Sequence, residues 1–294
     1  MHSYLRAVGF SNIKSRSELD QIFGQIMDHP TYKEVSKGED KVTMAEISLD
    51  MADNMGISIR GEYDDKGFFH LDHYFPYFKG NHTSAREEVV INKRVDTQSY
   101  TGMCDDIRLG VSLIFFLQNA IDYMNLPVRE STSPKLVSVN LSGLSIDGKV
   151  ILGLNNDTKP NNQGNTMETK RRNQLMAEAR LGNQEAIDSL TIDDIDLYAL
   201  ISKRIKSEDV YSIVDSTFIP FGSESDNYSI IGTICEVNEV VNCMTGESLY
   251  HLIIDCNDMR FGVCINRTDL LGEPEVGRRF KGNVWMQGAI DFSF

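Results

Sequence analysis

The sequence predicts an α+β protein: an N-terminal antiparallel sheet packed on a long helix, short bridging helices and a C-terminal small OB-like β-barrel. Apolar and polar residues alternate between positions 43 and 75, and an apolar stretch with a narrow polar stripe fills 102–125. Five strand-like runs with glycines at the bends follow position 228. The expected units are an α+β domain (1–154), a linker or mobile loop (155–165), bridging helices (166–227) and an OB-like five-stranded barrel (228–294).

The first elements are a helix and a strand. Ser17 is placed to cap the helix, with Asp20 at its third position, and His29-Pro30 ends it. Residues 43–50 then alternate between two faces, as a half-buried strand does. The apolar face of the helix comprises Leu19, Ile22, Phe23, Ile26 and Met27.

Residues 57–75 are predicted to form a β-hairpin whose turn ends in a left-handed glycine. The loop length fixes the register, which places Arg60 opposite Asp72 and Glu62 opposite His70. Opposite charges across neighbouring strands are an ordinary means of stabilising a sheet. The sequence therefore predicts two charge couples on one face of this hairpin. A further strand is predicted over 89–95.

A long helix is expected over residues 102–125. Asp105 and Asp106 would lie in its first turn, where the helix dipole favours carboxylates, and Asn125-Leu126-Pro127 would close it. Its narrow polar stripe predicts that it is mostly buried in the first domain. A second hairpin is expected over 136–154, with its turn at Ile146-Asp147-Gly148.

The segment 155–165 contains no apolar side chain, which is typical of a linker or mobile loop. Three short helices are predicted behind it. The first covers 168–181 and ends at Gly182, the second covers 183–190, and the third is capped by Thr191. We expect these helices to bridge the two sheets.

The C-terminal segment predicts five strands. A small barrel built from them would have no exposed edge, because closure pairs every strand on both sides. The strands are expected over residues 229–241, 249–256, 259–265, 279–286 and 288–294.

The composition is acidic, with 29 Lys and Arg against 43 Asp and Glu and a formal net charge of −14. An acidic surface repels DNA, RNA and anionic lipids, so nucleic-acid binding is disfavoured and no membrane association is expected. The start of the chain lacks an apolar signal core, and the longest apolar run, 109–121, is interrupted by polar residues. We therefore expect a cytoplasmic protein whose five cysteines stay reduced, and we expect the last four to be small buried side chains on strands.

Several segments resemble a known family. The block over residues 256–288 contains Leu271-Gly272-Glu273-Pro274-Glu275-Val276-Gly277 and Trp285-Met286-Gln287-Gly288. The opening Tyr4-Leu5-Arg6-Ala7-Val8-Gly9-Phe10-Ser11 and the middle residues 194–210 also contribute. On these residues the chain resembles an uncharacterised clostridial family, domain of unknown function 3881. The resemblance covers nearly the whole chain and implies no reaction, cofactor or catalytic residue.

The candidate ligand-binding residues are on the polar face of the predicted hairpin. An acid, a base and an imidazole on one face can transfer protons or hold a small polar ligand. The alternative is that the charge couples only stabilise the sheet. The motif His70-x-x-His73 does not predict a metal site, because residues three apart on a strand face opposite sides. The candidates are Arg60, Glu62, His70, Asp72 and Tyr74.

A candidate partner surface lies in the predicted barrel. Arg278, Arg279 and Lys281 form a basic cluster, and Trp285 is expected to cover a partner or to pack beneath the bridging helices. OB folds bind single-stranded nucleic acid on one barrel face, but the corresponding face here offers no stackable aromatic besides His251.

Three functions follow from these patterns. The first is a cytoplasmic, non-catalytic binding or adaptor protein whose partner is a protein or a small polar ligand. The second is a small-molecule enzyme or sensor that uses the polar face of the 57–75 hairpin. The third is single-stranded nucleic-acid binding through the barrel. We expect no cofactor and no metal, since no phosphate loop, dinucleotide-binding motif or closely spaced ligand set occurs, and homo-oligomer formation is left open.

Overall fold

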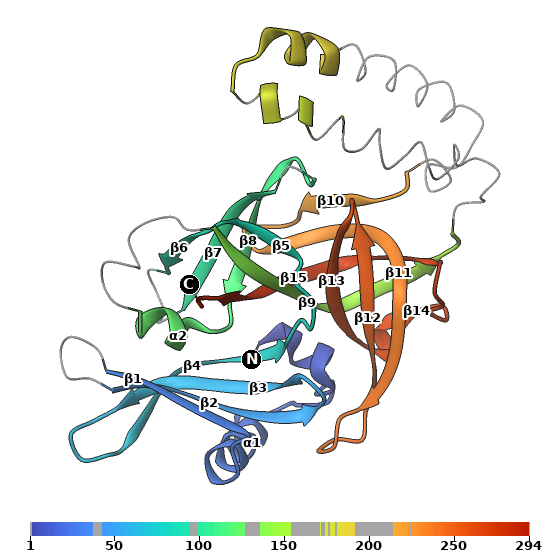
Figure 1. Cartoon of the computed structure of the whole chain (residues 1–294). Helices are drawn as coiled ribbons and strands as arrows, with labels where there is room; N and C mark the ends of the chain where they lie inside the picture. The colour runs from blue at the N-terminus through green and yellow to red at the C-terminus, as the bar shows by residue number, and fades with distance from the viewer. Residues whose placement is uncertain are drawn as a thin grey trace.

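The computed structural model describes residues 2–37, 43–94, 99–106, 108–126, 136–153, 214–223 and 225–293, together with 171, 174–175, 177–179 and 181–191. In these parts of the chain the strands form two sheets (Figure 1). The smaller has the order β1-β2-β3-β4, and the larger contains 11 strands. The fold is mainly β, so the predicted α+β class is wrong.

The smaller sheet and the helix on it occupy the N-terminal part of the chain, and the larger sheet takes its strands from the middle and the C-terminal part. The short helix α2 covers Ala120–Met124. The other N-terminal elements are η1 (Ser3–Val8), α1 (Arg16–Asp28), β1 (Tyr32–Lys37), β2 (Thr43–Ala52), β3 (Met55–Tyr63) and β4 (Phe69–Phe78). The larger sheet comprises β5 (Ala85–Glu88), β6 (Val90–Lys93), β7 (Tyr100–Asp106), β8 (Val111–Leu117), β9 (Leu136–Ile151), β10 (Thr217–Pro220), β11 (Asn227–Val241), β12 (Ser248–Cys256), β13 (Met259–Asn266), β14 (Leu270–Leu271) and β15 (Arg279–Asp291); η3 (Arg267–Asp269) precedes β14.

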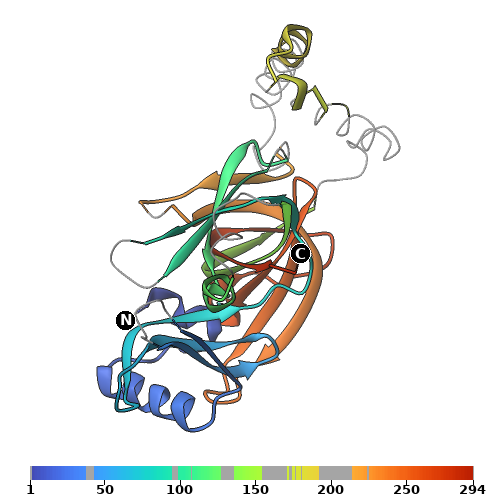
Figure 2. The ribbon, with the colours of Figure 1, turned by 60° about the vertical axis from the view of Figure 1, so that its left-hand side comes forward.

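Helix α1 covers the outer face of the four-stranded sheet, whose other face lies toward the larger sheet (Figure 2). The cap is Ser15 and not the expected Ser17. Its Oγ accepts from the backbone N of Glu18 at 3.2 Å, and Glu18 in turn accepts from the backbone N of Lys14 at 3.0 Å. This reciprocal arrangement places the cap two residues before the predicted one, because the glutamate at the third position completes it. Of the predicted apolar face, Leu19, Ile22, Phe23 and Ile26 are buried, and Met27 is exposed.

The predicted hairpin forms, but its register is correct only near the turn. Glu62 lies opposite His70 as expected, and Gly67 is left-handed with φ of 83°. A β-bulge then places His73, instead of Asp72, opposite Arg60. One extra residue in β4 reverses the alternation of every later side chain, which sends Tyr74 to the helix side of the sheet.

The long helix predicted over 102–125 is wrong. Its place is taken by β7, a turn at Gly110 with φ of 68°, β8 and the five-residue helix α2. Strand β8 runs between two hydrophobic cores: Leu113, Phe115 and Leu117 pack into one, and Phe116 packs into the other. A strand buried on both faces has no polar side, so its pattern resembles that of a buried helix.

The hairpin predicted over 136–154 is also wrong, because these residues form the single strand β9. The expected turn residue Asp147 instead lies opposite Asn283 of β15, whose backbone N and side-chain amide both donate to its carboxylate, at 3.1 and 3.0 Å. The register of the two strands shifts between Asn283 and Val284. An irregularity in a long strand pair thus accounts for the turn-like sequence.

The prediction of a small OB-like barrel is wrong, because its strands belong to a large mixed sheet. Strands β11, β12 and β13 form where predicted, with a tight turn in which Asn257 and Asp258 both have positive φ. The last two predicted strands are one strand, β15, and β9 lies between β13 and β15. Because β11 also pairs with β15, the large sheet curls back on itself, and it uses a strand from outside the predicted barrel segment to do so.

The predicted segments between the sheets are only partly described. Residues 184–191 are helical, as expected for the second bridging helix, and Gly182 has φ of 85°. The linker expected over 155–165 and the third helix lie outside the described residues. The division at residues 154 and 228 stays a prediction, although strands from both sides of it share one sheet.

Two of the free cysteines, Cys256 and Cys264, are buried in strands, as predicted. Cys104 is also buried, but it lies in β7 and not in the predicted helix. Cys235 is half-buried in β11, whereas Cys243 is exposed in the turn after that strand. Burial raises the pKa of Cys104 and of Cys256 to about 12 and raises that of Cys264 as well, which suppresses their reactive thiolates.

Iodoacetamide is therefore expected to label Cys243 in the folded protein, and to label Cys104, Cys256 and Cys264 only after unfolding. Peptide mass spectrometry with and without urea measures the difference. Rapid labelling of Cys264 in the absence of urea would contradict the packing described here.

Candidate functional site

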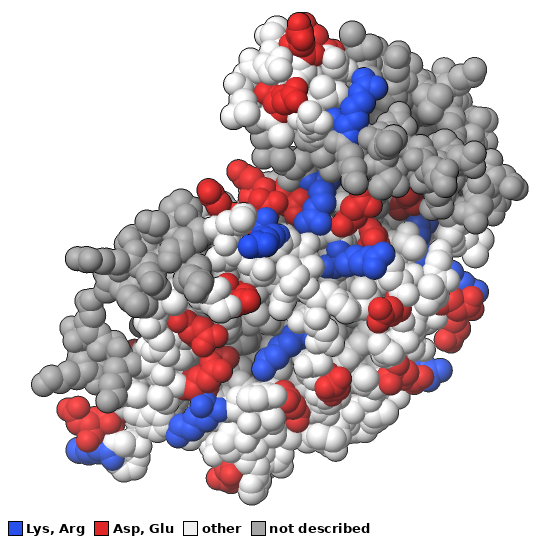
Figure 3. Space-filling model, in the orientation of Figure 1, with Lys and Arg blue, Asp and Glu red and all other residues white. Residues whose placement is uncertain are grey.

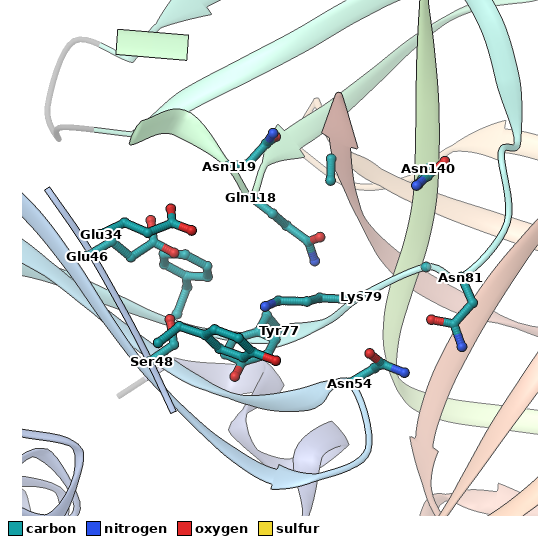
Figure 4. A pocket seen from close by; sticks show the side chains of 14 residues that line it. Glu34, Glu46, Ser48, Asn54, Tyr77, Lys79, Asn81, Gln118, Asn119 and Asn140 are labelled. Carbon is teal, nitrogen blue, oxygen red and sulfur yellow. The ribbon is translucent and has the colours of Figure 1, made fainter. Parts of the chain in front are cut away.

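A cavity of 320 Å³ lies between the four-stranded sheet and the larger sheet (Figure 4). The floor comes from β1, β2 and β4, and the opposite wall comes from the turn after β8 and from β9 and β15. The volume is at the lower end of the range for small-molecule sites. The polar lining residues are Tyr32, Glu34, Glu46, Ser48, Asn54, Tyr77, Lys79, Asn81, Gln118, Asn119 and Asn140, and the wall is completed by Phe75, Gly80 and Ala289.

One end of the cavity is acidic. Glu34 and Glu46 lie directly opposite each other on β1 and β2, and Figure 4 shows their side chains next to each other. Glu46 is paired with Arg60, whose Nε donates to Glu46 Oε2 at 2.8 Å and whose Nη2 donates to the backbone O of Gln118 at 3.1 Å. Glu34 has no hydrogen bond or ion pair with another described residue. Partial burial, followed by the charges of Asp122 and Glu46, raises the pKa of Glu34.

Gln118 lines the cavity with a side chain whose amide nitrogen is fixed by hydrogen bonds to neighbouring residues. Its Nε2 donates to the backbone O of Phe78 and to Gln287 Oε1, both at 2.8 Å. Gln287 is oriented in turn, since its Nε2 donates to the backbone O of Pro76 at 2.8 Å. Reversing the Gln118 amide would place two acceptors against each other, so its orientation is fixed. The Oε1 of Gln118 is buried and has no donor among the described residues.

Tyr77 and Lys79 form the middle of the cavity. Tyr77 donates its hydroxyl to Asp50, and burial together with this hydrogen bond raises the pKa of Tyr77 well above its usual range. The Lys79 ammonium lies 4.2 Å from the centre of the Tyr32 ring and 5.1 Å from that of Tyr77. Both distances are within the range of cation–π attraction, so this part of the cavity favours positive charge.

The five ligand-binding residues predicted from the hairpin are not brought together. Arg60 is fully buried beneath the cavity, and it pairs with Glu46 instead of Asp72. His70 contacts Asp64 through Nε2 at 3.1 Å, so the expected couple with Glu62 is replaced. The remaining two residues make other contacts: Asp72 binds His73 Nδ1 at 2.7 Å, and the Tyr74 hydroxyl accepts from the backbone N of His2 at 2.8 Å. A ligand role for this set stays a prediction.

The predicted partner surface is largely internal. Arg279 is 3 % exposed, and its guanidinium donates to the backbone O of Leu152 and of Val214. Trp285 is 6 % exposed, and its Nε1 donates to Asp226 Oδ2 at 3.0 Å. Arg278 pairs with Glu275 at 2.8 Å, and Lys281 is half-buried in β15. A partner could therefore contact Arg278 and Lys281 directly, but it could not reach the buried Arg279 and Trp285.

The face of the predicted barrel that was considered for nucleic-acid binding is also engaged in contacts within the protein. His251 is buried against Phe78 with ring centres 4.4 Å apart, and burial lowers its pKa to about 4. Arg260 pairs with Asp255 at 3.1 Å. On the face drawn in Figure 3, the described Lys and Arg side chains are scattered among Asp and Glu. Nucleic-acid binding stays a prediction that no contiguous basic surface on this face supports.

A second hollow of 400 Å³ lies between α1 and the turn joining β11 to β12. Of its two carboxylates, Glu247 already accepts from Ser11 Oγ at 2.8 Å and from Asn266 Nδ2 at 2.6 Å, and Glu18 accepts from the backbone N of Lys14 at 3.0 Å. The bonds of Glu247 tie η1 to the larger sheet, and together these contacts leave little capacity for a ligand. The inter-sheet cavity is therefore the stronger candidate.

Sequence reasoning missed most of the cavity. The polar face of residues 43–50, which carries Glu46 and Ser48, was recognisable from alternation. Consecutive strands usually pair, so the face of β2 that carries Glu46 could have been joined to the face of β3 that carries Arg60. Gln118 and Asn119 could not be placed, because they follow a strand that was interpreted as a helix.

The described part of the chain shows neither a metal-ligand cluster nor a membrane-spanning helix. The described residues contain no group of three or more His, Cys, Asp or Glu side chains placed to hold a metal ion. Among the described helices, none has both the length and the apolar character needed to cross a membrane.

Comparisons with known proteins identify a family. The sequence profile described as "Domain of unknown function, E. rectale Gene description (DUF3881)" matches residues 5–288. No curated protein and no solved structure matches the chain. The match runs from within η1 to within β15, so it includes both sheets and every lining residue of the cavity except Ala289. The chain belongs to the DUF3881 family.

Proposed function

We propose that this protein binds a small polar ligand in the inter-sheet cavity and acts in the cytoplasm as a binding protein. The observation that carries the proposal is the chemistry of the lining, which combines two carboxylates, one ammonium and five side-chain amides with three aromatic rings. Such a lining provides many directional hydrogen bonds in a confined volume.

Unused hydrogen-bonding capacity supports the proposal. The Gln118 carbonyl is buried without a donor, and a buried polar group without a partner costs about 1–3 kcal/mol. Asn54, Asn81 and Asn140 make no side-chain hydrogen bond with another described residue. A polar ligand would satisfy these groups. Among the described residues that line the cavity there is no histidine or cysteine, which favours binding over nucleophilic or imidazole chemistry.

Ligand-observed NMR with a panel of amines, amino acids, sugars, nucleosides and organic acids tests the proposal. At least one class is expected to bind the wild-type chain. Filling the cavity with Ala289→Phe, or blocking its rim with Asn81→Trp, is expected to weaken that binding at least tenfold through steric exclusion.

The matched control is Val276→Phe, which adds the same ring at an exposed position outside the cavity. It should leave binding unchanged. The proposal is wrong if no class binds, or if binding survives in both cavity variants with the fold intact by circular dichroism.

A further inference from the structure

The geometry points to a small primary amine with hydroxyl or amide groups at its other end as the ligand of the inter-sheet cavity, its ammonium held by Glu34 and Glu46. This inference rests on the proposed function and specifies the chemical class of ligand. It is carried by three independent features: the charges at one end of the cavity, a buried acceptor in its wall and the uncommitted amides at the other end.

The first feature is a carboxylate in excess. Glu34 and Glu46 are opposite each other in the β1–β2 register, an arrangement that destabilises a sheet when both are charged. Arg60 compensates Glu46. Glu34 also feels the negative charge of Asp122 of α2, and Lys79, which attracts it, lies over the two tyrosine rings without an ion pair to it. A cationic group between the two glutamates would remove the repulsion.

The second feature is the Gln118 carbonyl. The side chain is 6 % exposed, lines the cavity and carries an Oε1 without a donor in the described structure. Figure 4 shows it extending into the space between the glutamates and the asparagines. Its amide nitrogen is committed to Phe78 and Gln287, so it offers a ligand an acceptor and no donor. Three acceptor side chains therefore face a ligand group that must supply several N–H donors, as an ammonium does.

The third feature is the neutral end of the cavity. Asn54, Asn81 and Asn140 lie on the side away from the two glutamates (Figure 4). Each amide has both donors and an acceptor, so together they suit hydroxyl or amide groups and not a second charge. The ligand is thus cationic at one end and neutral and polar at the other.

Three probes of equal length separate the alternatives: 4-aminobutan-1-ol, butane-1,4-diol and 4-hydroxybutanoate. Ligand-observed NMR titrations of the full chain at pH 7 and low salt are expected to show the amine binding at least tenfold more tightly than the other two. Its affinity should fall as salt is added, because screening weakens the attraction between its ammonium and the partly exposed Glu34.

Glu34→Gln removes the excess charge at an exposed position of the edge strand and should weaken binding of the amine about tenfold, in line with the loss of one charge-assisted hydrogen bond. Glu62→Gln is the matched control, since it removes a carboxylate of the same sheet that does not line the cavity, and it should have no effect. Equal binding of the diol or the acid, or no effect of Glu34→Gln, overturns the inference.

The two proposals fail in different ways. Suppose that a neutral or anionic compound binds, that Ala289→Phe or Asn81→Trp abolishes this binding, and that the amine does not bind. The amine inference is then wrong, and the proposed function stands. If no compound shows binding that depends on the cavity, both are wrong.

Discussion

Replacing Arg60 by methionine is expected to lower the free energy of unfolding by about 3–5 kcal/mol, since it leaves a largely buried carboxylate without its partner. Arg60 is fully buried, and the Glu46 side chain is 13 % exposed. The guanidinium also lies 5.0 Å from the centre of the Phe75 ring and binds the backbone O of Gln118. One side chain therefore joins the four-stranded sheet to the turn after β8.

Urea denaturation followed by circular dichroism measures this loss. The double variant Arg60→Met with Glu46→Leu is expected to recover most of it, because removing both partners leaves no unpaired charge. Arg86→Met, on an exposed position of β5, is the control and should change stability by no more than about 0.5 kcal/mol. A cost below about 1 kcal/mol for Arg60→Met would show that the guanidinium contributes little to stability, either through its ion pair with Glu46 or through its bond to the Gln118 backbone.

Trp285→Ala is expected to cost about 3–5 kcal/mol, the range for truncating a large buried aromatic side chain. The indole packs against Tyr4 and Phe116, with ring centres 5.4 and 5.2 Å away. It also donates to Asp226, which is 1 % exposed and keeps Arg94 as its other partner at 2.5 Å.

Trp285→Phe separates packing from hydrogen bonding. It keeps a ring in the core and should cost about 1–3 kcal/mol, the range for removing one partner of a buried polar group. Arg278→Ala, at a half-buried residue of the same predicted surface, should cost no more than about 0.5 kcal/mol. Unfolding in urea is followed by circular dichroism and not by tryptophan fluorescence, because both Trp285 variants remove the single tryptophan of the chain. A fully stable Trp285→Ala variant would instead agree with the surface role expected from the sequence.

Strands with one polar face were predictable from the sequence. Residues 43–50 alternate clearly, and local turn residues such as Gly67 and Asn257-Asp258 mark where strands reverse. These elements form at nearly the predicted positions. Local information sufficed because both the face and the turn of each strand are encoded within a few residues.

The remaining errors have long-range causes. Strand β8 is buried between two cores, so the alternation that identifies a strand is missing from Val111–Leu117. The bulge at Asp72 depends on how β4 packs under Arg60, and a single inserted residue changes the face of Phe75 and Tyr77. Because Phe75, Tyr77, Gln118 and Asn119 of these two regions line the cavity, its lining could not be assembled from the sequence.

The position of β9 has a consequence for synthesis of the chain. Its neighbours β13 and β15 are both encoded far downstream, as the hydrogen bond from Ser145 Oγ to the Asn283 backbone O across 138 positions illustrates. While the ribosome is still translating the C-terminal third, a nascent chain can pair residues 136–139 of β9 with the upstream strand β5, but the rest of β9 still lacks β13 and β15. Unpaired strand edges recruit other strands, so this protein must either emerge quickly or be shielded by chaperones until β15 arrives.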